Sequence, residues 1–122
     1  MEIVGGLHVV MTDVVPEEEA DFNRWYEEEH IPERVALDGC LSARRFRRFR
    51  HDAGGPSPAE LQGQLQRGRQ YLVAYELRDA EVFESPEWQN LSKNQSEHSR
   101  RMLGSMRQVV AGTYTLLRTF EK

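Results

Sequence analysis

The chain has 122 residues, of which 39% are hydrophobic and 30% charged, and these values predict one folded domain over residues 1–122 rather than a disordered chain. No apolar run approaches the roughly 20 residues of a membrane helix, and the first residues lack a signal-peptide pattern, so we expect no membrane partner and no secretion. The net charge of −4 disfavours nucleic acid as a partner, and the single cysteine, Cys40, rules out an intrachain disulfide and suits a reducing cytoplasm.

A strand and then a helix are predicted in the first third of the chain. Residues 6–14 are rich in β-branched types and should form the first strand. Pro16 suits the first turn of a helix, and the acidic residues that follow it favour the positive end of the helix dipole. Pro32 disfavours helix at the residue before it, so we expect the helix to end near His30 and a short separate turn over 33–37.

Two further strands flank a long insertion. Residues 41–50 and 70–77 alternate in the manner of strands, and every second residue of 70–77 falls on one face. The segment between them, 51–68, contains several Gly and Pro residues and is longer than an ordinary hairpin loop. We therefore expect a flexible loop insertion, which could be a mobile lid but is more simply a surface excursion.

The last third of the chain completes a recognisable order of elements. A helical region is predicted over 80–105, interrupted at Ser85-Pro86, where Ser can cap one helix and Pro can begin the next. We expect residues 107–120 to form the last strand. The order β-α-β-β-α-β predicts an α+β, ferredoxin-like fold, in which a four-stranded antiparallel sheet carries two helical regions on one face.

The last strand also predicts what covers the other face of the sheet. Apolar residues occupy both of its faces: Val109, Ala111 and Leu117 alternate with Val110, Tyr114 and Leu116. A sheet that is apolar on both faces needs a second cover. We therefore expect a homodimer in which two sheets pack face to face.

One stripe of the first helix gathers aromatic rings and an imidazole. The residues at helical spacing are Phe22, Trp25, Tyr26, Glu29 and His30. His30 is the leading catalytic candidate, because an imidazole with an ordinary pKa near ~6.5 takes and returns a proton at neutral pH. A structural histidine at a helix end is the alternative. Tyr26 either pairs with His30 to polarise a substrate carbonyl or is a core residue with its hydroxyl at the surface.

A run of arginines follows the acidic helix. It comprises Arg44, Arg45, Arg47, Arg48 and Arg50, interleaved with Phe46 and Phe49. The simplest interpretation is a solvated strand end whose arginines pair with neighbouring acids. The alternative is a carboxylate or phosphate site, because a guanidinium offers a two-pronged donor.

Three motifs together resemble a known family. They are Phe22-Asn23-x-Trp25-Tyr26-x-x-x-His30-Ile31-Pro32, Gly39-x-Leu41-x-Ala43-Arg44-Arg45-Phe46 and Ser85-Pro86-x-Trp88. The chain resembles the EthD-like branch of the dimeric α+β barrel superfamily over most of its length, the 51–68 insertion excepted. It departs from that group at Asp38-Gly39-Cys40, where relatives have Pro-Gly and a large aromatic residue.

The resemblance implies a cavity between the helices and the sheet of each protomer. Relatives include cofactor-free polyketide cyclases, quinone-forming monooxygenases, muconolactone isomerases and haem-binding enzymes, so the fold indicates the site rather than the reaction. The expected function is a small cofactor-independent enzyme that transfers protons on a partly apolar, aromatic or polyketide-like molecule. The alternative is a non-catalytic small-molecule-binding or accessory module of a catabolic or biosynthetic system.

The expected site follows from this cavity. His30 and Tyr26 are the catalytic candidates, with His8 as a second proton-transfer group or a structural histidine. The residues expected to bind substrate are Phe22, Trp25, His8, Tyr71, Tyr75 and Trp88, of which the strand residues reach the cavity only if their parity matches. No phosphate-binding or compact metal-ligand pattern is present in the sequence, so we expect no metal and no cofactor. A haem-dependent variant would use His98 as axial ligand.

Overall fold

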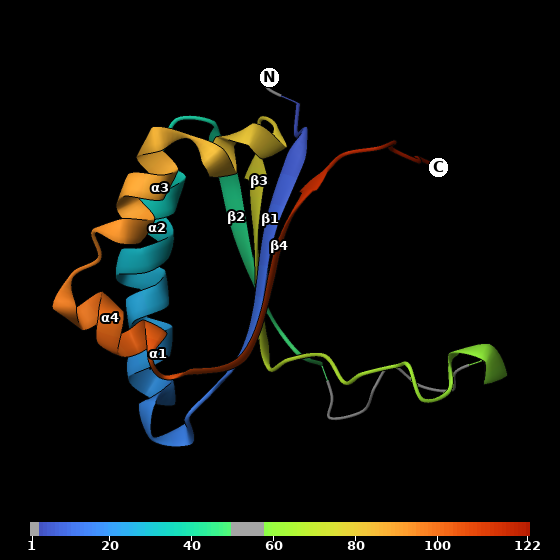
Figure 1. Ribbon diagram of the computed structural model, residues 1–122, viewed down its shortest axis with the longest axis horizontal. Coiled ribbons are helices and arrows are strands. Elements are labelled where there is room, and N and C mark those ends of the chain that lie inside the picture. The colour runs from blue at the N-terminus through green and yellow to red at the C-terminus, as the bar shows by residue number, and fades with distance from the viewer. Residues whose placement is uncertain (1–2, 50–57) are drawn as a thin grey trace.

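The computed structural model describes residues 3–49 and 58–122, and it has the predicted βαββαβ order (Figure 1). The strands are β1 (Gly6–Val14), β2 (Cys40–Arg47), β3 (Tyr71–Leu77) and β4 (Met106–Thr115). They form one antiparallel sheet in the order β2-β3-β1-β4. The helices all lie on one side of this sheet, so the ferredoxin-like prediction is confirmed.

The first helical region is longer than predicted. It runs through the 3₁₀ turn η1 (Pro16–Glu18), α1 (Glu19–Trp25), the π-helical turn η2 (Tyr26–His30) and α2 (Ile31–Val35). The predicted break at Pro32 is wrong. In the wider π turn the Ile31 N–H donates to the Tyr26 carbonyl five residues back, and Pro32 then occupies the first turn of α2, where its missing N–H needs no partner.

The second helical region has two interruptions. It consists of η4 (Ala80–Glu84), α3 (Pro86–Lys93) and α4 (Glu97–Leu103). The predicted break at Ser85-Pro86 is confirmed, since the Ser85 hydroxyl accepts a hydrogen bond from the Trp88 N–H at 3.2 Å. A second break separates α3 from α4, and there Ser96 caps α4 by accepting from the Ser99 N–H at 3.1 Å.

Two strands end earlier than predicted, because their partners end. The last pair of β2 is Arg47 with Tyr71, the first residue of β3, so the strand ends at Arg47. In β4 the last pair is Thr115 with Gly6, and the chain beyond leaves the sheet on the side away from the helices (Figure 1). Of the predicted 51–68 insertion, residues 58–68 are described and carry the 3₁₀ turn η3 (Ala59–Leu61), and residues 51–57 lie outside the described part.

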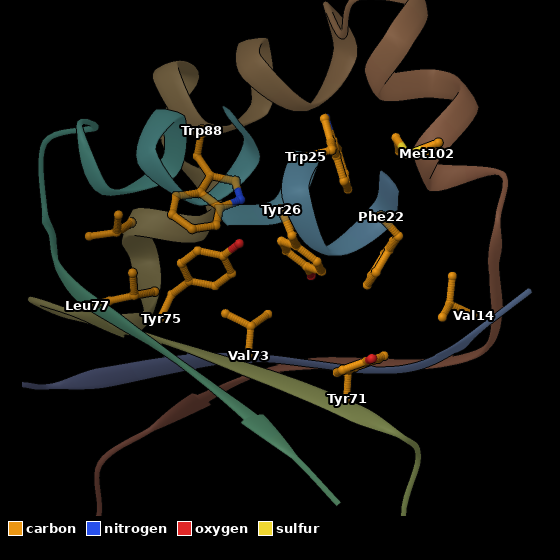
Figure 2. Close-up of a cluster of buried hydrophobic side chains, with 11 residues drawn as sticks. Val14, Phe22, Trp25, Tyr26, Tyr71, Val73, Tyr75, Leu77, Trp88 and Met102 are labelled. Atoms are coloured by element: carbon orange, nitrogen blue, oxygen red, sulfur yellow. The ribbon is translucent and has the colours of Figure 1, made fainter. Parts of the chain in front are cut away.

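The core fills the space between the sheet and the helices. Alternate residues of β3 point into it, and aromatic rings from the helices meet them, as Figure 2 shows for Phe22, Tyr26 and Trp88 above Tyr71, Val73 and Tyr75. The buried set is Val14, Phe22, Trp25, Tyr26, Tyr71, Val73, Tyr75, Leu77, Val82, Trp88 and Met102. Among the described residues, no helix has the length and apolar character needed to cross a lipid bilayer.

The opposite face of the sheet carries uncovered apolar side chains. Phe46, Val110 and Tyr114 are 53%, 40% and 58% exposed. Their partners in the neighbouring strands are Leu72, Met11 and Leu7. These partners alternate with the buried residues of β3 and β1, so they lie on the face of the sheet opposite to the core. We call Phe46, Val110 and Tyr114 the outer apolar face.

Candidate functional site

A cavity of about 360 Å³ lies between the helices and the inner face of the sheet. It is lined by His8, Val10, Tyr26, His30, Arg34, Tyr75, Phe83, Trp88, Ser92, Gln95, Leu103, Met106 and Val109. Its size falls in the range of small-molecule sites, and its wall is mostly aromatic and aliphatic with a few polar groups. We call it the helix–sheet cavity.

The structure places five of the sequence-predicted site residues around this cavity and three outside its lining. His8, Tyr26, His30, Tyr75 and Trp88 line it. The other three, Phe22, Trp25 and Tyr71, are buried in the core instead. The two tyrosines of β3, Tyr71 and Tyr75, both point toward the helices (Figure 2). Tyr75 lines the cavity, whereas Tyr71, four residues earlier in the strand, does not.

His30 is held by aromatic rings and lacks a polar partner at one nitrogen. Its ring stacks on Trp25 with centroids 4.5 Å apart and meets Tyr26 edge-on at 5.2 Å. Its Nδ1 is buried and has no hydrogen-bond partner among the described residues. Burial, and secondly the charge of Arg34, lower the pKa of His30 to about 4, so the imidazole is neutral at pH 7.

His8 faces the same cavity from β1. Its Nδ1 lies 2.9 Å from the Thr113 hydroxyl on β4, in a hydrogen bond, and its ring stacks on Phe83 with centroids 4.6 Å apart. Burial and then Arg34 lower the pKa of His8 to about 4 as well. The cavity therefore holds two neutral imidazoles.

Arg34 is the charged cavity residue that the sequence analysis missed. It lies one helical turn after His30, is only 7% exposed, and carries its guanidinium 4.8 Å above the Trp88 ring. It donates to the Trp88 carbonyl at 3.2 Å and to the Ser92 hydroxyl at 2.9 Å. Burial lowers its pKa. The sequence did carry a signal for Arg34, because Tyr26, His30 and Arg34 follow one another at intervals of four residues and so fall on one face of a helix. The expected break at Pro32 concealed this spacing.

Two phenols complete the polar lining. The Tyr75 hydroxyl is buried without a hydrogen-bond partner in the described structure, and burial raises the pKa of Tyr75. Burial raises the pKa of Tyr26 to about 12, against the opposing charges of Arg45 and Arg34. Both phenols are therefore protonated at neutral pH and can donate a hydrogen bond.

A second arginine, Arg45 of β2, lies on the helix-facing side of the sheet, and a carboxylate balances its charge. The Arg45 guanidinium stacks 4.9 Å from Tyr26 and 5.2 Å from Tyr71. It bonds to the Glu27 carboxylate at 2.6 Å and the Asn23 side-chain oxygen at 2.8 Å. The ion pair between Arg45 and Glu27 agrees with the simpler interpretation of the arginine run, in which the arginines pair with neighbouring acidic residues.

The other candidates for ligand chemistry lie away from the cavity. His98 is exposed on α4 and does not line it. Over residues 3–49 and 58–122, no group of three or more His, Cys, Asp or Glu side chains is arranged to hold a metal ion. Cys40 is half-buried, and burial raises the pKa of its thiol, which makes the thiol less reactive.

Comparison with known proteins gives one family and a set of similar folds. Residues 7–116 match a family described as "Domain of unknown function (DUF4286)". No curated protein matches the sequence. Solved structures with the same fold include a dimeric ferredoxin-like protein from an uncultured marine organism, with 10% identity, coverage of 99% of this chain and 95% of the other, and a TM-score of 0.64.

Two further structures are similar at the same level. An ethyl tert-butyl ether D (EthD) family protein from Bacillus halodurans C-125 has 13% identity, coverage of 92% and 99%, and a TM-score of 0.54. The haem degrader MhuD from Mycobacterium tuberculosis, solved with two haems in its active site, has 11% identity, coverage of 95% and 99%, and a TM-score of 0.54. At such identities the likeness is one of fold, and it agrees with the expected ferredoxin-like α+β fold.

Proposed function

The chain belongs to the DUF4286 family, and from its helix–sheet cavity we propose that it binds a partly apolar, aromatic or polyketide-like small molecule on which His30 transfers a proton without a cofactor. One observation carries this proposal. A neutral, buried imidazole with an unpartnered nitrogen lies in an aromatic cavity beside a buried guanidinium and an unpartnered phenol. Buried polar groups are normally paired, so unpaired ones that line a cavity favour a ligand that pairs with them.

The proposed step is an enolisation. A ring nitrogen of neutral His30 takes a proton from the carbon next to a substrate carbonyl. The C–H electron pair becomes the C=C bond, and the carbonyl π pair moves to oxygen, which becomes an enolate. In an isomerisation, the imidazolium returns the proton to another carbon of the conjugated enolate. In a cyclisation, the enolate carbon bonds to a second carbonyl carbon of the same molecule, the π pair of that carbonyl moves to its oxygen, and this oxygen takes the proton from the imidazolium. Neither reaction needs an external oxidant.

Arg34 and Tyr75 suit the oxygen on which charge develops. A guanidinium and a phenol O–H that are already buried stabilise an enolate without reorganising water, and such preorganised donors are often the largest contribution to catalysis. Tyr26, whose ring meets the His30 ring edge-on, can help to polarise the substrate carbonyl. The charge that forms on His30 and the charge on the enolate offset each other.

A second candidate function has its own support. A histidine whose pKa is about 4 is a weak base at neutral pH, which favours a pocket that binds and carries a molecule without changing it. The distinction between enzyme and binding module therefore depends on whether bound carbon acids exchange protons.

Hydrogen–deuterium exchange measures that step directly. The α-protons of 2-tetralone and of acetylacetone are followed by NMR in D₂O at pD 7.5, with wild-type protein and the variants His30→Gln and His98→Gln. We expect the wild type and the His98→Gln control to accelerate exchange about 10²-fold or more, and His30→Gln to lose the acceleration. Binding of either ketone without exchange would assign the non-catalytic function. A Soret band that forms on haem titration and disappears in His30→Gln would assign a haem site instead.

We also propose that the protein is a homodimer built through the outer apolar face. Phe46 on β2 and Val110 and Tyr114 on β4 expose apolar surface on two of the sheet's strands, and a second copy of the same face is complementary to it. The dimeric ferredoxin-like relative supports this assembly by analogy of fold.

A further inference from the structure

We propose that the ligand of the helix–sheet cavity is an aromatic or polyketide-like carboxylic acid, bound as a monoanion whose carboxylate pairs with Arg34. This inference rests on the proposed function for its cavity and names the substrate class. It starts from a buried guanidinium that pairs with no carboxylate among residues 3–49 and 58–122.

Arg34 has no carboxylate within ion-pair distance among the described residues, although it is more deeply buried than any arginine that has one. Burial lowers the pKa of Arg34 and the charge of its exposed chain neighbour Glu33 raises it, but no ion pair joins the two side chains. The contrast with Arg45 is direct, because Arg45 is bonded to the carboxylate of Glu27 at 2.6 Å. Burying an unpaired charge is costly, and an anion that arrives with the ligand removes that cost.

The guanidinium is oriented before the ligand arrives. One terminal nitrogen donates to the Trp88 carbonyl, the other donates to the Ser92 hydroxyl, and the planar group lies over the Trp88 indole. A guanidinium has more N–H donors than these two bonds use, and they lie in one plane. A carboxylate can accept two of them in parallel, which is the strongest arrangement of this pair.

The surrounding groups select a single negative charge. Every other titratable side chain that lines the cavity is neutral at pH 7: His8 from β1, Tyr26 and His30 from η2, and Tyr75 from β3. The positive charge to be matched is therefore that of Arg34 alone. With Arg34 on the carboxylate, the unpartnered Tyr75 hydroxyl is the donor that stays available for the carbonyl oxygen on which the enolate charge develops.

The rest of the lining suits an aromatic body. Phe83 and Trp88 present rings 6.1 Å apart, and Leu103 and Val109 contribute aliphatic wall. An aromatic acid thereby buries its ring among rings while its carboxylate reaches Arg34.

Calorimetric titration with a matched pair of probes tests this inference. Cinnamate and its neutral amide, cinnamamide, share shape and ring but differ in charge, and each is titrated into the wild-type protein at pH 7.5. We expect cinnamate to bind at least about 10-fold more tightly. Arg34→Gln should abolish this preference, Arg34→Lys should keep part of it, and Arg24→Gln, an exposed arginine of α1, should leave it unchanged.

Equal affinity for the two probes, or no binding of cinnamate at millimolar concentration, would overturn the inference, and this comparison uses only wild-type protein. A preference that survives in Arg34→Gln would also overturn it. The exchange assay with the neutral ketones reports on His30 separately. Ketone exchange without cinnamate preference refutes the carboxylate class alone, and cinnamate preference without ketone exchange refutes proton transfer alone.

Discussion

Arg34 holds Trp88 at two points, because its guanidinium lies 4.8 Å above the Trp88 ring and also donates to the Trp88 backbone carbonyl at 3.2 Å. The first contact fixes the side chain and the second fixes the first turn of α3. One residue of α2 therefore joins the two helical regions and shapes the wall of the cavity. The same residue lowers the pKa of both cavity histidines, as the second cause after burial.

The pH dependence of stability should report on His30. Its pKa is about 4 in the folded protein and near 6.5 in the unfolded chain, so between these values the unfolded chain binds a proton that the folded protein does not. The free energy of unfolding should therefore fall as the pH drops through this window, by at most about 3 kcal/mol from His30. Urea unfolding at several pH values should give a shallower slope for His30→Gln, whereas the exposed control His98→Gln should keep the wild-type slope. Parallel curves for wild type and His30→Gln would contradict the lowered pKa.

Ser99→Ala should destabilise the packing of α1 against α4. The Trp25 indole N–H donates to the buried Ser99 hydroxyl at 2.9 Å, and the substitution leaves that N–H buried without an acceptor. We expect a loss of about 1–3 kcal/mol in the free energy of unfolding, measured by urea denaturation. The control is the same change in a Trp25→Phe background, where no indole donor remains and the cost should be clearly smaller. An equal cost in both backgrounds would show that the hydrogen bond contributes nothing.

Val110→Asp should separate the proposed dimer into folded monomers. The side chain is 40% exposed in the protomer but would be buried between two sheets, where an unpaired carboxylate is strongly unfavourable. Sedimentation velocity at micromolar concentration should show a dimer for the wild type and a monomer for the variant, with unchanged circular dichroism. Val35→Asp, on the helical side of the sheet, is the matched control and should remain dimeric. A monomeric wild type would refute the assembly.

Gly39→Ala should cost more than Gly63→Ala, although both glycines have positive φ values of +87° and +81°. Both alanines would be strained in this backbone region, at about 1 kcal/mol. At Gly39 the new Cβ would also lie 2.6 Å from a methyl carbon of Val82, whereas at Gly63 nothing lies within 4 Å. We expect about 2–3 kcal/mol for Gly39→Ala in thermal or urea unfolding. Equal costs would indicate that Val82 moves aside freely.

The element order and the residues of β3 that share one face could be predicted because they depend on neighbours in the sequence. The period of two in β3 and the spacing of Phe22, Tyr26 and His30 are local properties, and both agree with the buried faces of the structure. The helix end was mispredicted because a general preference at Pro32 was overridden by a π turn that the packed helix accommodates. The strand ends were misplaced because pairing stops where the partner strand stops.

The tertiary structure alone decided which residues line the cavity and how the pKa values of its histidines are shifted. His8, His30 and Arg34 come from β1, η2 and α2, and only packing determines that they surround the same space. The pKa of an imidazole depends first on how much water the surrounding elements exclude and then on which charge they bring near, and neither quantity is encoded in a short stretch of chain. The sequence by itself thus determined the order of the elements and which residues share a face. The fold decided which face points inward and which inward residues became core or cavity wall, because that difference depends on how well distant side chains fill the space between them.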